Sequence, residues 1–239
     1  MPSEHGLIDT IRSNLAPIHP DGHKFVAIAG GIVLVAWLLV PWTLFAYLTL
    51  AAAVYVAYFF RDPARVTPLR EGLVIAPADG RISAIESVRP PAELGLDATP
   101  RLRISIFLSV FDVHVNRSPV AGRITRSIYV PGAFLNAALD KASEENERRA
   151  LVVTQANGTE IAVVQIAGLI ARRIVTSKGE GESIGVGERF GLIRFGSRVD
   201  VYLPPGQTAL VATGQRAVAG ETVLADLKSA EPEREARAT

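Results

Sequence analysis

The chain has 239 residues, which is enough for one large domain or two small ones. Its 25 basic and 24 acidic residues almost cancel, so no overall charge favours nucleic-acid binding. Cysteine is absent, which excludes disulfide bonds, cysteine nucleophiles and thiolate metal sites and fits a reducing compartment. Because His114 is the one histidine beyond residue 23, we expect no metal site in the remainder of the chain.

The N-terminal part of the chain predicts a membrane anchor. Residues 1–24 form a polar arm, whereas residues 25–60 contain no charged residue at all. A single span needs about 20 apolar residues, and Pro41 divides this stretch into Phe25–Val40 and Thr43–Phe60. We therefore expect a helical hairpin that either spans the bilayer thinly or lies in one leaflet. The stretch is too long for a cleaved signal peptide, and the alternative is a buried core hairpin in a soluble protein.

The positive residues Lys24 and Arg61 flank both ends of the apolar stretch. Positive flanks favour the cytoplasmic side of a membrane. We therefore expect the chain to be attached to the cell (inner) membrane, with the rest of it on the cytoplasmic side.

In residues 61–227, short apolar runs are separated by glycine and proline. This pattern is typical of an antiparallel barrel or sandwich. We predict a mainly β domain with α+β character at its margins, one helix near Asn136–Glu147, and a disordered tail over residues 228–239. The expected strands are Leu73–Ala76, Ile82–Val88, Leu102–Leu108, Ile124–Val130, Ala150–Gln155, Glu160–Ile166, Glu188–Phe195, Val199–Leu203 and Thr208–Ala212.

Gly196 and Ser197 interrupt a strand pattern and are the candidate site of chemistry. One interpretation is a simple β-bulge. The other is that Ser197 attacks the carbonyl of Gly196, whose missing side chain leaves the approach open. An ester would replace the amide, elimination across the serine Cα–Cβ bond would release Gly196 as a new C-terminus, and the dehydroalanine would hydrolyse to a pyruvoyl group. Its ketone could form an imine with a substrate amine.

Residues 191–200, Gly-Leu-Ile-Arg-Phe-Gly-Ser-Arg-Val-Asp, resemble the processing site of the phosphatidylserine decarboxylases, in particular the short bacterial type. Four further stretches resemble the same family in the same order: Tyr58–Pro63, Ala76–Gly80, Phe107–Arg117 and the run from Phe134 to Glu144. The resemblance implies pyruvoyl-dependent decarboxylation of phosphatidylserine to phosphatidylethanolamine and carbon dioxide. It also implies autocatalytic cleavage into a large chain, residues 1–196, and a small chain, residues 197–239.

The resemblance also assigns roles to two further residues. A serine hydroxyl needs a base, and His114 is the histidine available to take its proton and later to protonate the product. Asp79 matches the family's aspartate, which would hold the imidazole in one tautomer. The alternatives are a structural core histidine and an Asp-Gly turn at Asp79.

Two features depart from the longer members of the family. Those members have Leu-Gly-Ser-Thr at the cleavage point, where this chain has Phe-Gly-Ser-Arg. They also have a second histidine three residues after the first, where this chain has Arg117. The work of that histidine could fall to His114, or in part to Arg117 or Asn116. Strand alternation places Asn116 on the same face as His114 and Asp112.

A lipid substrate would explain the hairpin, because the acyl chains stay in the bilayer while the domain reaches the head group. Arg61, Arg65 and Arg70 follow the hairpin and are either lipid contacts or topology determinants. Arg172, Arg173 and Lys178 are candidates for the substrate phosphate, with a solvated loop as the alternative.

We expect the two cleavage products to stay together as a heterodimer, since the strands on either side of the cut should lie in one sheet. A homodimer of such pairs is left open by the sequence.

Two other functions compete with this interpretation. The chain could be a membrane-anchored binding module similar to lipoyl or sugar-transport barrels, with no cleavage, in which case one intact chain is expected. A β-type metallopeptidase is suggested by Val113-His114-Val115, but it would need further histidine ligands that the sequence lacks beyond His114.

Overall fold

The computed structural model describes residues 16–40, 42–133, 145–168, 173–194, 196–232, 234 and 236–237. Its contacts divide the chain into two compact units, residues 1–64 and 65–239. The family stretch from Phe134 to Glu144 lies outside the described residues, and so does most of the helix expected near Asn136–Glu147.

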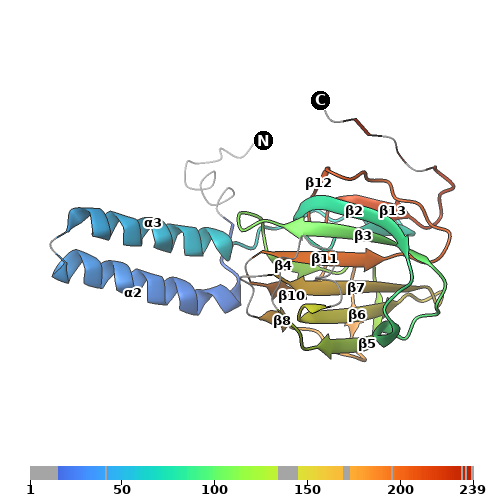
Figure 1. The fold of residues 1–239 in the computed structure, drawn as a ribbon, viewed down its shortest axis with the longest axis horizontal. Helices are drawn as coiled ribbons and strands as arrows, with labels where there is room; N and C mark the ends of the chain where they lie inside the picture. The colour runs from blue at the N-terminus through green and yellow to red at the C-terminus, as the bar shows by residue number, and fades with distance from the viewer. Residues whose placement is uncertain are drawn as a thin grey trace, which may run out of the picture. The chain divides into compact units, whose positions relative to one another are not determined.

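The first unit is a pair of apolar helices, α2 (His23–Leu39) and α3 (Thr43–Phe59), preceded by the short helix η1 (Pro20–Gly22). The two long helices lie side by side (Figure 1). Their buried positions include the small residues Ala36 and Ala46, which permit close approach of the helix backbones. The base is closed by a hydrogen bond from the backbone N–H of His19 to the carbonyl of Phe60, 2.8 Å.

The outer surface of this hairpin is apolar. Leu38, Leu39, Trp42 and Leu44 each leave between 72% and 76% of their surface exposed. A contiguous apolar surface of this kind marks a site of interaction with a membrane or with another protein. The segment Pro20–Leu39 is long and apolar enough to cross a membrane, whereas Thr43–Phe59 is also apolar but shorter. The helix pair expected from the sequence is confirmed, and the length and apolar composition of its first helix are those of a membrane span.

The second unit is built from three antiparallel sheets, so the mainly β class is confirmed. The largest is a curled sheet with the order β12-β2-β3-β11-β7-β6-β5-β9 (Figure 1). Its strands are β12 (Arg216–Ala217), β2 (Gly80–Val88), β3 (Arg101–Leu108), β11 (Ser197–Tyr202), β7 (Glu160–Ala167), β6 (Arg148–Thr154), β5 (Gly122–Val130) and β9 (Ser183–Ile184). The smaller sheets are β4-β10-β8, made of Val115–Arg117, Arg189–Ile193 and Ile174–Thr176, and β1-β13, made of Leu73–Ile75 and Val223–Asp226.

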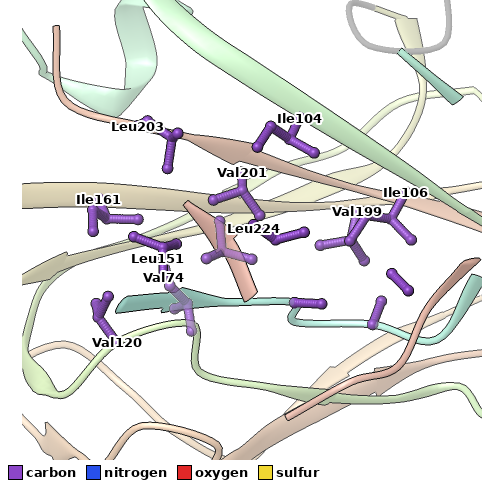
Figure 2. Packing of buried hydrophobic residues seen from close by; sticks show 14 of the residues in the cluster. Val74, Ile104, Ile106, Val120, Leu151, Ile161, Val199, Val201, Leu203 and Leu224 are labelled. Carbon is purple, nitrogen blue, oxygen red and sulfur yellow. The ribbon is translucent and has the colours of Figure 1, made fainter. Parts of the chain in front are cut away.

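The main hydrophobic core lies on the inner face of the large sheet. Figure 2 shows side chains of β11, among them Val199 and Val201, grouped with those of β3, β1 and β13. Ile106, Val74 and Leu224 belong to the same fully buried cluster. Burying side chains of this size contributes about 1.5–3 kcal/mol each. The alternation of β11 therefore directs Ser197, which has the same parity as Val199, to this inner side.

The outer face of the sheet carries a second, smaller cluster. Tyr202 of β11 packs there with Val164 of β7, and the short helix η2 (Ala92–Leu94) covers them through Leu94. Burial raises the pKa of the Tyr202 hydroxyl to about 12. On the same side of β11, the buried side chains of Arg198 and Asp200 form a two-point ion pair at 2.9 and 3.0 Å.

Two expectations about the strands are wrong. Thr208–Ala212 is not a strand, although the N–H of Leu210 still donates to the carbonyl of Leu224 at 2.8 Å. The strands that flank Gly196 and Ser197 also do not share a sheet, because β10 belongs to the three-stranded sheet and β11 to the eight-stranded one. The chain therefore crosses between sheets at the candidate cleavage point.

Candidate active site

Gly196 lies at the crossing from β10 to β11 and has a left-handed backbone, with φ of +53°. A residue with a side chain would be strained there by about 1–2 kcal/mol. Apart from its two chain neighbours, no described residue lies within 4 Å of the place where a Cβ would be. The glycine is therefore required by its backbone conformation and not by a close approach of other residues.

Ser197 begins β11, a central strand of the large sheet, between Leu108 of β3 and Ala167 of β7. It is fully buried, and its Oγ has no hydrogen-bond partner among the described residues. An unsatisfied buried hydroxyl costs about 1–3 kcal/mol, so fold stability does not explain this serine. Ser105 also has a buried hydroxyl without a partner in the described part of the chain. Ser105 follows Ile104, whereas Ser197 follows a glycine with a left-handed backbone.

His114 lies just before β4 and is also buried. Its Nδ1 is 2.9 Å from the carbonyl oxygen of Asp112. Since a carbonyl can only accept, Nδ1 must carry the proton, and the lone pair of the neutral ring is then on Nε2. This is the tautomer required of a general base. The carbonyl of His114 accepts from the N–H of Ile193 at 3.2 Å, which joins the histidine to the segment that leads into Gly196.

Asp112 holds the turn in front of His114. One carboxylate oxygen accepts from the N–H and the hydroxyl of Ser109, at 2.8 and 2.7 Å, and the other accepts from Arg216. The main chain of Asp112 thus orients the imidazole while its side chain fixes the turn. Strand alternation in the sequence predicted that Asp112 and His114 share a face. It did not predict that the Asp112 carbonyl would contact the imidazole while the Asp112 carboxylate holds the turn.

Asp79 is buried, and its two oxygens have separate partners. One forms an ion pair with Arg65 at 2.7 Å, and the other accepts from the N–H of Ala219 at 2.8 Å. Burial raises the pKa of the Asp79 carboxyl, the neighbouring charge of Asp112 adds to this rise, and Arg65 opposes it. The position is fixed by Gly80, where a Cβ would lie 2.2 Å from the carbonyl oxygen of Phe107. Asp79 therefore lies within electrostatic range of the turn that orients His114.

A buried polar bridge next to the site was not predicted. Asn116 of β4 accepts from the side-chain nitrogen of Gln165 at 2.7 Å, and the Asn116 Nδ2 has no hydrogen-bond partner among the described residues. Gln165 pairs with Val199 in the β7–β11 ladder, which makes it a diagonal neighbour of Ser197 on the same face. An isolated glutamine in an apolar strand is too weak a sequence signal to identify. The bridge places a spare amide donor in the buried region that contains Ser197.

The remaining described candidates make contacts of their own. Arg117 donates to the carbonyl of Gly187 at 3.0 Å. Lys178 forms ion pairs with Glu188 at 2.7 Å and Glu182 at 3.8 Å, so a phosphate would have to displace a carboxylate. Arg173 is exposed, and Arg172 lies outside the described residues.

Cleavage between Gly196 and Ser197 would leave the small fragment interleaved with the large one. Its first strand, β11, lies between β3 and β7, while β12 pairs with β2 and β13 pairs with β1. Every described strand C-terminal to the cut thus pairs with strands N-terminal to it. The sheet could remain intact without the peptide bond.

Comparisons with known proteins point to one family. A sequence model of the family described as phosphatidylserine decarboxylase matches residues 53–225. A protein of Azorhizobium caulinodans named phosphatidylserine decarboxylase proenzyme is 61% identical over 224 residues, 94% of this chain and 95% of the relative. Relatives of the same name from Xanthobacter autotrophicus and Nitrobacter winogradskyi are 59% and 57% identical, over 95% and 92% of this chain and 96% and 88% of their own lengths.

Proposed function

The chain belongs to the phosphatidylserine decarboxylase family, and from this premise we propose that it cleaves itself between Gly196 and Ser197 and then decarboxylates phosphatidylserine through a pyruvoyl group at position 197. The observation that carries the proposal is the Ser197 hydroxyl, which is buried without a described partner directly after a left-handed glycine. The family is one of carboxy-lyases, and its members' name of proenzyme supports a self-processed form.

We assign the first step to Ser197, His114 and Asn116. His114 Nε2 takes the proton of the Ser197 hydroxyl, and the oxygen attacks the carbonyl carbon of Gly196. Negative charge then develops on the Gly196 oxygen, and we assign its stabilisation to the Asn116 amide, whose Nδ2 has no described partner. Collapse of this intermediate breaks the C–N bond and returns a proton to nitrogen, which gives an ester. Loss of the Ser197 α-proton then expels Gly196 as a carboxylate.

The dehydroalanine left at position 197 gains water and loses ammonia, which completes the pyruvoyl group. The residues present fit this group, because its carbonyl would replace a buried hydroxyl that has no described partner. The group supplies a ketone that holds the substrate amine and accepts the electron pair as carbon dioxide leaves. His114 then delivers a proton to the product carbon.

We place the substrate in the membrane to which the hairpin attaches the chain, on the cytoplasmic side, as the positive flanks at Lys24 and Arg61 favour. The large and small chains form one heterodimeric unit. Among the three candidate cations for the substrate phosphate, the exposed Arg173 is better suited than Lys178, which is already paired with two glutamates.

The decarboxylation itself is tested on the purified, processed protein. With phosphatidylserine in mixed micelles, we expect release of carbon dioxide that stops after treatment with phenylhydrazine, because the reagent consumes the ketone. Phosphatidylethanolamine should appear in equal amount. Carbon dioxide release that survives complete reaction with phenylhydrazine would rule out the pyruvoyl group as the reactive centre.

The pH dependence of self-cleavage tests the role proposed for Asp79, an ionised carboxylate that stabilises the charged form of His114. Arg65 lowers the pKa of Asp79, so Arg65→Met should raise that pKa and move the acidic limb of the cleavage rate to higher pH. The matched control is Arg70→Met, which removes an ion pair of the same length, 2.7 Å, to Asp226. If the cleavage rates of the parent and of Arg65→Met fall at the same acidic pH, an ionised Asp79 has no part in the mechanism.

A further inference from the structure

We propose that the turn Ser109–Asp112 is a second membrane contact, in which Phe111 enters the lipid interface and Arg216 and Arg81 meet anionic head groups. This inference rests on the proposed function, because it explains how the buried reaction centre is presented to a lipid. The partner is a bilayer surface that contains phosphatidylserine.

The first observation is an exposed aromatic side chain on a fixed turn. Phe111 leaves 63% of its surface exposed. The turn beneath it is closed by the hydrogen bond from the N–H of Asp112 to the carbonyl of Ser109, 3.0 Å, and by the two bonds from Ser109 to the Asp112 carboxylate. A turn held in this way presents Phe111 outward without a loss of loop entropy on binding. Aromatic rings are favoured at the membrane–water interface.

The second observation is the position of the turn in the site. It follows Leu108, the last residue of β3, which pairs with Ser197. It also carries the Asp112 carbonyl that contacts His114. A bilayer in contact with Phe111 would therefore be close to the end of the sheet at which the proposed reaction begins.

The third observation is the sign of the neighbouring charge. Arg216 contacts Asp112 yet leaves 71% of its side chain exposed, and the exposed Arg81 pairs with it in the β12–β2 ladder. Basic residues at a surface attract anionic lipids. An apolar tip beside two exposed cations is complementary to a surface of phosphatidylserine.

The contact is measured with a single tryptophan as a depth probe. The two natural tryptophans are Trp37 and Trp42, and both are replaced by phenylalanine. Into this background we introduce Phe111→Trp or, as the matched control, Ala98→Trp, which is exposed at the opposite end of β3. Each full-length protein is reconstituted into phosphatidylcholine–phosphatidylserine vesicles with bromine atoms near the head-group end of the acyl chains.

We expect the bromine atoms to quench the emission of Phe111→Trp and to leave that of Ala98→Trp unchanged. Equal quenching of both probes, or of neither, would overturn the proposal. An emission change of Phe111→Trp that depends on protein concentration in the absence of vesicles would also overturn it, because the surface would then bind a second copy of the chain.

Activity gives an independent readout. Phe111→Ser should reduce decarboxylation of vesicle-bound phosphatidylserine by roughly tenfold, the order expected from losing burial of one aromatic ring. Self-cleavage and turnover of a dispersed short-chain phosphatidylserine should stay at the parent level. An equal loss on both substrates would contradict a role in lipid contact. If the parent neither cleaves nor decarboxylates, the proposed function fails, while the quenching result still decides the membrane contact.

Discussion

Ser197→Ala is expected to yield a single uncut chain, whereas the parent yields two fragments. The change removes the nucleophile, and alanine has no oxygen to form the ester, so neither cleavage nor the pyruvoyl group can follow. The fold should persist, because the hydroxyl has no described partner and the alanine retains the β11 ladder. Denaturing mass spectrometry of both proteins measures the difference, together with complete loss of decarboxylation in the variant.

Ser105→Ala is the matched control, since Ser105 has a buried hydroxyl without a described partner on the neighbouring strand β3. It should cleave as the parent does. If Ser197→Ala were still cut at the same bond, the serine would have no part in the reaction.

His114→Gln should slow self-cleavage by about 10²–10⁴-fold, the usual contribution of a general base. Glutamine approximates the size and polarity of the imidazole but cannot take a proton at neutral pH. The rate is followed as the appearance of the two fragments with time. His19→Gln, in the helix unit, should leave the rate unchanged. A parent-like rate in His114→Gln would assign the proton transfer to another group.

Long helices and strands, which have a regular pattern of apolar residues, were predictable from the sequence. The helices α2 and α3 begin and end within two residues of the expected Phe25–Val40 and Thr43–Phe60. Most long strands agree similarly, because alternation over five or more residues is a clear signal. Strands of two or three residues, such as β9 and β12, are too short to show a period, and they depend on pairing with distant segments.

The site was predictable only in part, for a related reason. The motifs identify Gly196, Ser197 and His114, because these residues are recognisable within short stretches. The contacts of Asp79 with Ala219 and of Asn116 with Gln165 join residues 140 and 49 positions apart. Such contacts follow from sheet topology, and no local pattern records them. The left-handed backbone of Gly196 is also a property of the crossing between two sheets.

The sheet order shows how a cut chain can remain one protein. A break after Gly196 removes one covalent bond but leaves the ladder pairings of Arg198–Tyr202, which hold β11 between β3 and β7. The core residues Val199 and Val201 stay buried in the same cluster. We therefore expect the two fragments to separate only when the protein is unfolded.

The central claim is that one peptide bond of this chain is converted into a carboxyl end and a reactive ketone. Its most direct test is the denatured intact mass of the protein isolated from cells, measured before and after reaction with phenylhydrazine. The account predicts one fragment that ends at Gly196 and a second that begins at position 197 and gains a single hydrazone. A single unbroken chain of 239 residues that does not react with the reagent would contradict it.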